Sequence, residues 1–271
     1  MAYEILVLDI DGTLTNSKKE ITSRTLETLL KLQENGQKVV LASGRPTPGI
    51  VPLAKQLKLD QYGGYILSYN GAKVINVATQ EVIYNAVLPK ELIPDVYQAV
   101  LEYKVGIITY ENNEVLVGNG FDEYNRLEAR INNIAMREVE NFVEYITFDI
   151  NKCLLTGEPD YLATVEVEFK KRFGDQLNIY RSEPFFLEIM PQNIDKAYSL
   201  GKLLKHLDLS RKQMICCGDG FNDLSMIQYA GLGVAMSNAQ QVVKDAADYI
   251  TLSNDEDGVV HVIEKFMYGD V

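Results

Sequence analysis

Two carboxylates, two positions apart, follow a short apolar run near the start of the sequence. Asp9 and Asp11 come directly after residues 5–8, and Gly12 follows them. At the end of a strand, a turn through the glycine can bring both carboxylates around one point. Two like charges that close are costly unless a cation lies between them, and Mg²⁺ prefers hard oxygen ligands of this kind. Taken alone, the pair is equally consistent with a helix N-cap and a turn residue.

A second acidic cluster strengthens the hypothesis of a metal site. Asp219 and Asp223 follow another apolar run, in the segment GDGFND at residues 218–223. If the two apolar runs are strands of one sheet, their ends deliver carboxylates to the same place. A metal held by Asp9, Asp219 and one backbone carbonyl would then be a Mg²⁺ site that leaves positions for water and phosphate.

Two further groups could bind the phosphate of a substrate. The residues Ser43-Gly44-Arg45 end an apolar run, and a hydroxyl with backbone N–H groups in such a turn forms an anion nest, although an ordinary turn explains them as well. Lys196 opens a predicted helix. A solvated lysine is the simpler interpretation, but the helix dipole disfavours a cation at that end, and a bound phosphate would account for it.

Together these groups match the requirements of phosphoryl transfer through an aspartyl-phosphate. One carboxylate, Asp9, would attack phosphorus, and the neighbouring Asp11 would protonate the leaving oxygen and then activate water. The metal and Lys196 would spread the charge of the transferring group.

The elements that must position these groups alternate between strands and helices. Apolar runs predict strands, and apolar stripes with N-cap and stop signals predict helices. The expected strands are 5–8, 38–42, 65–68, 213–217, 233–235 and 249–251, and the expected helices are 22–32, 51–57, 196–206 and 223–229. This alternation predicts an α/β protein with a Rossmann-like doubly wound parallel-sheet core, whose ligand-binding groups lie at the carboxyl ends of the strands.

Between the two halves of this pattern the predicted secondary structure changes. Hairpin-like alternation and longer helical stretches predict a smaller α+β domain at residues 85–188, inserted into a core formed by residues 1–84 and 189–271. Insertions at the ligand-binding edge commonly become lids, so we expect a cap domain.

Charge and composition restrict the partners. The 271 residues carry a formal net charge of −12, which disfavours nucleic acid and anionic membrane surfaces. A phosphate site must therefore supply its own local cation. The three cysteines have no metal-type spacing, and neither a signal peptide nor a membrane span is evident, so we expect buried free thiols and a cytoplasmic protein. We also expect a monomer or a weak homo-oligomer.

The site residues resemble the four motifs of the haloacid dehalogenase superfamily of phosphatases. The segment DIDGTL at residues 9–14 is similar to the first motif, Ser43 to the second, Lys196 to the third, and GDGFND at 218–223 to the fourth. Further similarity to the Cof-type branch, with a class IIB cap, lies in SGRP at 43–46, NGA at 70–72, GVAM at 233–236 with NA at 238–239, and the tail 254–259. Position 237, usually glycine in that family, is Ser237 here.

The resemblance implies roles for individual residues. Asp9 would be the nucleophile and a metal ligand, Asp11 the acid/base and a ligand through its backbone carbonyl, and Asp219 the third protein ligand of Mg²⁺. The phosphate would be held by Ser43, Gly44, Lys196 and Asn222, with backbone help from Ile10. Gly220 and Asp223 would be second-layer or water-mediated metal contacts.

The resemblance also implies that the cap chooses the substrate, typically a sugar phosphate or another small phosphorylated metabolite. Candidate contacts in the cap are Arg126, Glu128, Arg130 and Glu188. A solvated helix surface is the favoured explanation of the first three.

Other classes of function stay open from the sequence. A phosphomutase or phosphonate hydrolase of the same superfamily would carry a different cap between Asp11 and Ser43, where only a helix and a strand are expected here. A signalling receiver domain is normally less than half this length, and an inert phosphosugar-binding protein would be expected to lack Asp9 or Asp11.

Overall fold

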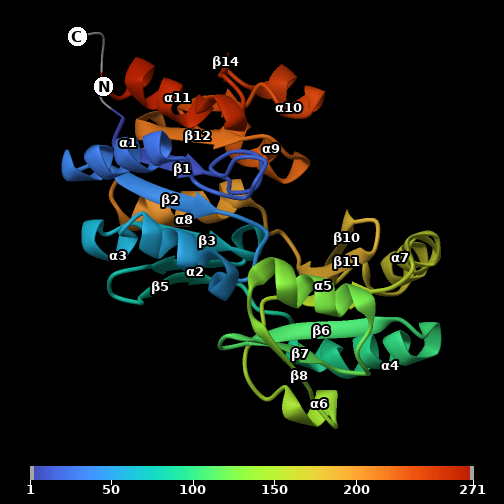
Figure 1. The fold of residues 1–271 in the computed structure, drawn as a ribbon. Helices are drawn as coiled ribbons and strands as arrows, with labels where there is room; N and C mark the ends of the chain where they lie inside the picture. Colours follow the sequence, from blue (N-terminus) through green and yellow to red (C-terminus); the bar gives the residue numbers. More distant parts are fainter. Residues whose placement is uncertain (1–2, 269–271) are drawn as a thin grey trace. The chain divides into compact units, whose positions relative to one another are not determined.

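The computed structural model describes residues 3–268, and contacts divide the chain into two units (Figure 1). The core unit contains the chain up to Tyr84 and again from Asp195, and the inserted unit contains Asn85–Ile194. We expected the chain to return to the core after residue 188. It returns later because Phe186–Pro191 forms a strand, β11, that pairs with two other strands of the inserted unit.

The core unit is built on an eight-stranded sheet with the order β14-β13-β12-β1-β2-β3-β4-β5. Its six strands from β14 to β3 are parallel, and β4 pairs with β3 in the antiparallel sense. This confirms the doubly wound parallel-sheet core. The strands are β1 (Ile5–Leu8), β2 (Lys38–Ala42), β3 (Tyr65–Ser68), β4 (Lys73–Asn76), β5 (Val82–Asn85), β12 (Met214–Gly218), β13 (Leu232–Ala235) and β14 (Tyr249–Ile250).

The central strands are apolar along their whole length because both faces of the sheet are covered. Every residue of β1 is fully buried, and so are Ile215, Cys216 and Cys217 in the neighbouring β12. Such continuous apolar runs are typical of parallel strands with helices on both sides. The two cysteines are free thiols of this core, as expected.

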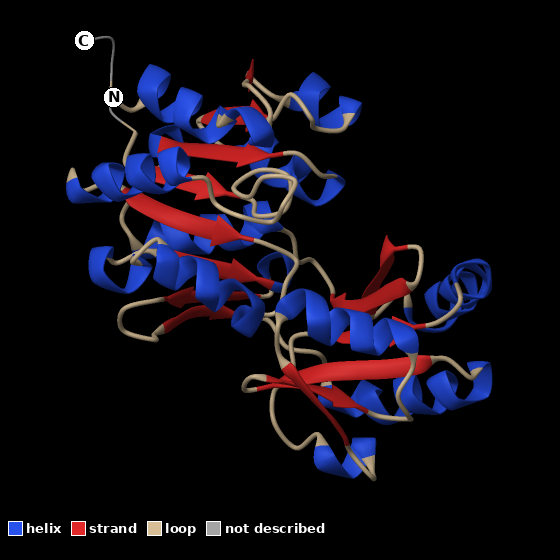
Figure 2. Cartoon of the chain, viewed as in Figure 1, coloured by secondary structure: helices blue, strands red, loops and turns tan. Residues whose placement is uncertain are grey.

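Helices cover both faces of the core sheet (Figure 2). Helix α1 packs with α11, and α8 packs with α9. Thr22 caps α1 by accepting the N–H of Thr25, as its position before the apolar stripe predicts. The helices are α1 (Ser23–Glu34), α2 (Thr47–Gln56), α3 (Leu59–Tyr62), α8 (Lys196–His206), α9 (Leu224–Tyr229), α10 (Gln241–Ala246) and α11 (Gly258–Phe266), with short 3-10 turns η1 (Tyr69–Gly71), η3 (Arg211–Gln213), η4 (Phe221–Asp223) and η5 (Asn254–Glu256).

The inserted unit has its own sheet and its own apolar core. Six strands have the order β10-β11-β9-β6-β7-β8, and the large aromatic side chains of Phe142 and Phe169 are fully buried beside them. The elements are β6 (Gly106–Glu111), β7 (Glu114–Val117), β8 (Ala135–Glu138), β9 (Cys153–Thr156), β10 (Leu177–Glu183) and β11, with η2 (Lys90–Leu92), α4 (Ile93–Tyr103), α5 (Glu123–Asn132), α6 (Phe142–Tyr145) and α7 (Pro159–Phe173).

Candidate active site

The first and fourth motifs meet because their strands are direct neighbours. In the register of the sheet, Leu8 of β1 lies opposite Cys217 of β12 on one side and Leu41 of β2 on the other. The residues that follow these strands therefore leave the same edge of the sheet. This is the edge where ligand-binding groups of open parallel sheets gather.

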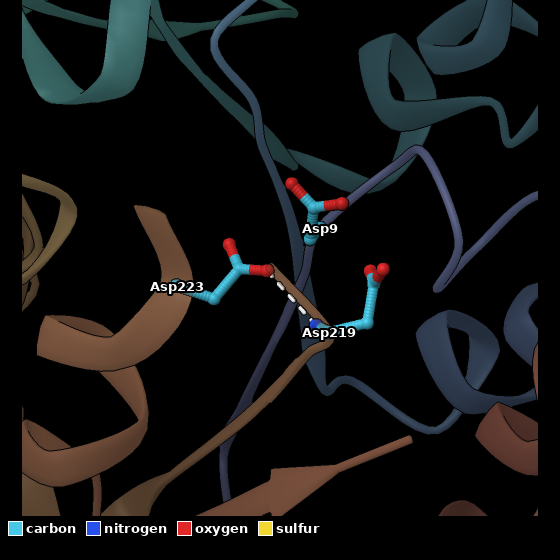
Figure 3. A group of neighbouring side chains, drawn as sticks. All are labelled: Asp9, Asp219 and Asp223. Carbon is cyan, nitrogen blue, oxygen red and sulfur yellow. Dashed lines mark hydrogen bonds between the residues drawn. The ribbon is translucent and has the colours of Figure 1, made fainter. Parts of the chain in front are cut away.

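Three carboxylates come together at this edge. Asp9, Asp219 and Asp223 each offer an oxygen within 4.8 Å of the others (Figure 3). Asp223 is fully buried, and its Oδ2 accepts the backbone N–H groups of Asp219 and Gly220, both at 2.9 Å. Asp223 thereby fixes the loop that presents Asp219.

Lys196, the first residue of α8, extends into the same cluster. Its side chain is completely buried, and its Nζ donates to Asp9 Oδ1 at 2.7 Å, to Asp223 Oδ1 at 2.6 Å and to the carbonyl of Ala42 at 2.8 Å. Burial disfavours the charged amine and would lower the pKa of Lys196. The attraction of Asp223 and Asp9 is stronger than this effect and raises the pKa above its ordinary value. Lys196 is therefore a fixed cation beside Asp9.

Negative charge still exceeds positive charge in the cluster. Burial, together with the nearby Asp223 and Asp219, raises the pKa of Asp9 well above its usual value, although Lys196 opposes the shift. Burial is also the main cause that raises the pKa of Asp219 to about 6, against the lowering effect of a hydrogen bond from Thr13 Oγ1 at 2.8 Å. A hard divalent cation fits this set of oxygen donors, because it would remove the repulsion that one lysine leaves.

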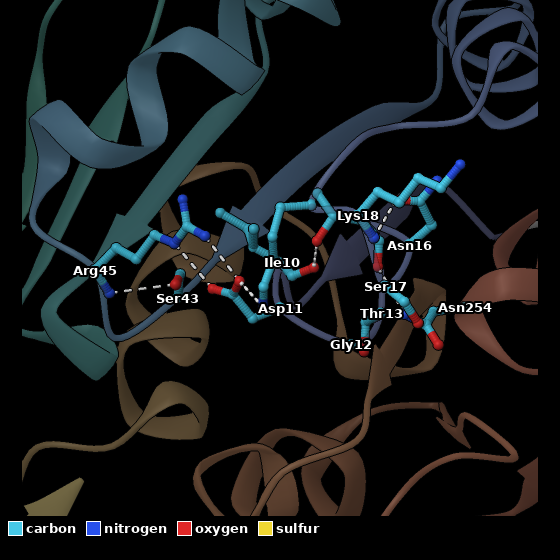
Figure 4. A network of polar contacts seen from close by, with 12 residues as sticks. Ile10, Asp11, Gly12, Thr13, Asn16, Ser17, Lys18, Ser43, Arg45 and Asn254 are labelled. Atoms are coloured by element: carbon cyan, nitrogen blue, oxygen red, sulfur yellow. Dashed lines mark hydrogen bonds and ion pairs between the residues drawn. The ribbon is translucent and has the colours of Figure 1, made fainter. Parts of the chain in front are cut away.

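The side chain of Asp11 is bound by two cations rather than by the cluster. Arg45 donates from Nε to Oδ2 at 2.8 Å and from Nη2 to Oδ1 at 2.7 Å (Figure 4). Lys19 Nζ donates to Oδ1 at 2.9 Å. Burial alone would raise the carboxyl pKa, but these partners hold the pKa of Asp11 below its usual value. Sequence reasoning placed Arg45 only in a turn and did not assign it this contact.

The expected phosphate-binding residues lie in connected turns. Ser43 is buried, and its Oγ accepts the N–H of Arg45 at 3.2 Å. Gly44 lies against the amide of Asn70, which in turn accepts a hydrogen bond from Asn222 Nδ2 at 3.0 Å. Asn70 was noted in the sequence only as part of a family motif, so its position between Gly44 and Asn222 is a structural finding.

The remaining expected positions have ordinary structural partners. Ile10 is buried, and its carbonyl accepts the N–H of Thr15 at 3.0 Å. Ser237 donates its N–H to the carbonyl of Leu252 at 3.3 Å, so a side chain is accommodated at this position.

The four candidate cap contacts differ in environment. Arg126 and Arg130 are exposed on α5, and Arg126 lies 4.8 Å from the ring centre of Phe121. The interpretation of Glu128 as solvated helix surface was wrong, since it is buried and accepts hydrogen bonds from Tyr110 and Asn132. Sequence spacing alone could not show that this face of α5 covers the sheet.

Glu188 is buried as well and forms an ion pair inside the inserted unit. Its Oε2 lies 3.0 Å from Lys152 Nζ, and its Oε1 accepts a hydrogen bond from Ser182 at 2.9 Å. A role in substrate binding is therefore not needed to explain its charge.

The doubly wound core, the inserted unit and the carboxylate site match what is expected of a phosphatase, and the comparisons with known proteins agree. A family model described as haloacid dehalogenase-like hydrolase matches residues 6–263, and the chain belongs to this family.

Relatives of known sequence or structure agree with this assignment. A haloacid dehalogenase-like hydrolase from Bacteroides thetaiotaomicron has 52% identity and a TM-score of 0.94, with 97% of this chain and 99% of that chain covered. “Putative phosphatase YxeH” of Bacillus subtilis (strain 168) is 31% identical over 98% of both chains. The structure described as “HAD Subclass IIB Sugar Phosphatase BT4131” has 26% identity and a TM-score of 0.81, covering 97% of this chain and 98% of that one. Among the described residues, no helix is long and apolar enough to cross a membrane.

Proposed function

We propose that this phosphatase hydrolyses small phosphorylated metabolites, with sugar phosphates as the first class to test, through a Mg²⁺-dependent aspartyl-phosphate on Asp9. The observation that carries the proposal is the fully buried Lys196, whose Nζ holds Oδ1 of Asp9 at 2.7 Å and leaves Oδ2 for attack. The choice of sugar phosphates is supported by the named activity of the subclass IIB relative.

Binding of the phosphate is assigned to the turns around the nucleophile. Ser43, the N–H of Gly44 and the amide of Asn222 would bind the phosphoryl oxygens, and Lys196 would stabilise their charge. The backbone N–H of Ile10 would assist from the first motif. These groups supply the local positive potential that an acidic protein needs for an anionic ligand.

The carboxylates of Asp9 and Asp219 and the backbone carbonyl of Asp11 would hold Mg²⁺. Its positive charge would stabilise the negative charge on the phosphoryl oxygens. Asp223 is an anchoring residue in this proposal, since Lys196 and two backbone N–H groups occupy its oxygens. Contacts of Gly220 or Asp223 with the metal would pass through water.

Hydrolysis would take place in two balanced steps. In the first, Oδ2 of Asp9 forms a bond to phosphorus, the bond to the leaving oxygen breaks, and the carboxyl of Asp11 gives that oxygen its proton. In the second, Asp11 takes a proton from water, the water oxygen attacks phosphorus, and inorganic phosphate leaves while the Asp9 carboxylate is restored.

For the first step, Asp11 must carry a proton, which Arg45 and Lys19 oppose in the structure described here. We therefore propose that the side chain of Asp11 exchanges its contact with Arg45 for the leaving group once substrate is bound. The backbone carbonyl of Asp11 can stay in place during this change, because only the side chain rotates.

The experiment combines a panel of phosphorylated metabolites with rapid acid quench. With Mg²⁺, wild-type protein should release phosphate from some of the panel, and Asp9→Asn should form no protein-bound phosphate. Asp11→Asn should accumulate protein-bound phosphate from p-nitrophenyl phosphate, because its leaving group needs no proton and only the second step then depends on residue 11. A chelator should stop turnover. Turnover by Asp9→Asn at the wild-type rate would refute the covalent mechanism, and a wild-type protein inert toward the whole panel would refute the proposed substrate class. A cytoplasmic location and a monomeric or weakly associated state stay predictions.

A further inference from the structure

The turn that follows β3 has an unusual backbone. Tyr69, Asn70 and Gly71 have φ angles of 53°, 51° and 105°, so three successive residues lie in the left-handed region. That region is sparsely populated for a bulky residue such as Tyr69, whose side chain is buried. Conformations of this kind persist where surrounding contacts enforce them, and they concentrate at functional sites.

The backbone of this turn holds the second motif from one side. Asn70 donates its N–H to the carbonyl of Ser43, and Tyr69 donates its N–H to the carbonyl of Arg45, both at 3.0 Å. The carbonyl and N–H of a trans peptide point in opposite directions. Because the Ser43 carbonyl points at Asn70, the N–H of Gly44 points away from the turn, as an anion-binding donor would.

The side chain of Asn70 bridges the second and fourth motifs. Its amide atoms would lie 3.0–3.3 Å from a Cβ at position 44, so the glycine there allows the amide to pack directly on the backbone. Its Oδ1 accepts the hydrogen bond from Nδ2 of Asn222 at 3.0 Å. Asn222 itself is exposed, so this contact limits the orientations of its side chain.

The third motif is attached to the same turn. A Cβ at position 71 would collide with the carbonyl oxygen of Asp195, and the hydroxyl of Ser199 donates to the carbonyl of Gly71. Asp195 is the N-cap of α8 and Ser199 lies in its first turn, and the helix begins with Lys196. The turn thus contacts the segments that carry Ser43, Asn222 and Lys196.

We propose that Asn70 is a positioning residue of the phosphate site, which acts through the side chain of Asn222 and the peptide of Gly44. This inference rests on the proposed function, since it assigns those two groups to the phosphate. Asn70 fixes their directions before a ligand arrives, and less conformational freedom is then lost on binding. The left-handed backbone is needed to bring the amide to this place, and asparagine tolerates that conformation better than other side chains do.

The test separates the effect of the Asn70 side-chain amide from the effect of the backbone conformation at position 70. Asn70→Gly retains a residue that accepts positive φ but removes the amide, and Asn70→Ala removes the amide and adds backbone strain. Inhibition of Mg²⁺-dependent turnover by inorganic phosphate gives the inhibition constant for each variant. Asn112→Gly is the matched control, because Asn112 has a φ of 50° in an exposed turn of the inserted unit.

We expect both Asn70 variants to raise the inhibition constant and KM about tenfold, while the control leaves the inhibition constant unchanged. Only Asn70→Ala should also lower Tm. In an Asn222→Ala background the further loss from Asn70→Gly should fall below about threefold, because residues that act through one another are not additive.

A wild-type inhibition constant in Asn70→Gly would overturn the proposal, as would fully multiplicative losses in the double variant with Asn222→Ala. The conservative Asn70→Asp keeps the acceptor for Asn222 but adds negative charge, so phosphate binding should weaken more than in Asn70→Gly. Failure of the proposed function would show differently, as a wild-type protein that neither turns over the panel nor binds phosphate.

Discussion

Each unit buries a lysine against carboxylates, and the two arrangements differ in charge balance. In the inserted unit, Lys152 forms an ion pair with one carboxylate among the described residues, that of Glu188, and both side chains are almost fully buried. In the core unit, Lys196 faces Asp9 and Asp223, and Asp219 is close by. A buried pair whose charges cancel is a structural element. A cluster in which negative charge exceeds positive charge has carboxyl groups with shifted pKa values and favours binding of a further cation.

The largest expected effect tests whether the acidic cluster around Lys196 contains the nucleophile. Asp9→Asn should lower kcat at least about 1,000-fold, corresponding to roughly 4 kcal/mol, since no covalent intermediate can form. Its Tm in the absence of metal should not fall, because one buried like charge is removed. Steady-state kinetics and calorimetry measure both, and near-normal kcat would place the nucleophile elsewhere.

Replacing the lysines tests the two arrangements directly. Lys196→Met and Lys152→Met should each lower the free energy of unfolding by about 3–5 kcal/mol, because each leaves buried carboxylates unpaired. Adding Glu188→Leu to Lys152→Met should restore most of that loss, as apolar replacement of a balanced buried pair often does.

Adding Asp223→Leu to Lys196→Met should not restore the free energy of unfolding. Asp223 also accepts the N–H groups of Asp219 and Gly220, which would lose their acceptor. Denaturant unfolding of the four proteins decides the matter. Equal recovery in both units would contradict the distinction between a structural pair and a functional cluster.

A smaller effect concerns the protonation of Asp219 in the core cluster. The pKa of Asp219 is raised to about 6 in the fold, so without metal the folded state binds its proton more tightly than the unfolded chain does. Stability should therefore decrease as pH rises from about 4 to about 6, by on the order of 1 kcal/mol for this partly exposed group.

Asp219→Asn should remove that decrease, and Mg²⁺ should offset it in the wild type. Thermal unfolding across this pH range, with and without Mg²⁺, measures both effects. Glu188→Gln is the control, because its carboxylate lies in the balanced pair. A Tm gain on adding Mg²⁺ that is as large in Asp219→Asn as in the wild type would exclude Asp219 as a ligand.

The smallest effects concern the cations around Asp11. Lys19 is mostly exposed, so Lys19→Ala should change the free energy of unfolding by less than about 0.5 kcal/mol, and Arg45→Gln by about 1 kcal/mol. The lowered pKa of Asp11 means that this stabilisation is present above about pH 4 and is lost as pH falls through the folded-state pKa. Unfolding at pH 7 and pH 3 should show a larger Arg45 effect at the higher pH.

The sequence predicted the parts of the fold that local pattern determines. Strands 38–42 and 65–68 and helix 196–206 have the expected bounds because apolar runs, caps and stop signals are local. β11 was missed, since Pro184 and Pro191 flank its apolar run and such a segment resembles a linker. A proline at the end of a strand does not prevent pairing, and here β9 and β10 enclose the run.

The site was predictable where its chemistry depends on residue type at strand ends. Asp9 and Asp219 could be recognised after predicted strands and Lys196 at the start of a predicted helix, and the structure brings all three together. The contact of Arg45 with Asp11 and the bridge formed by Asn70 could not, because they depend on the direction of side chains from turns far apart in sequence.

If the proposed reaction holds, the pair of Arg45 and Asp11 would also affect which compounds the enzyme can use. In the proposed reaction the two hydrogen bonds from Arg45 have to be exchanged for contacts with the leaving group. The phosphate is common to every substrate, so only the rest of the molecule can favour that exchange. Compounds with small leaving groups would then bind through their phosphate and react slowly. The pair would thus select among substrates by their rate of turnover, with little effect on how tightly each is held.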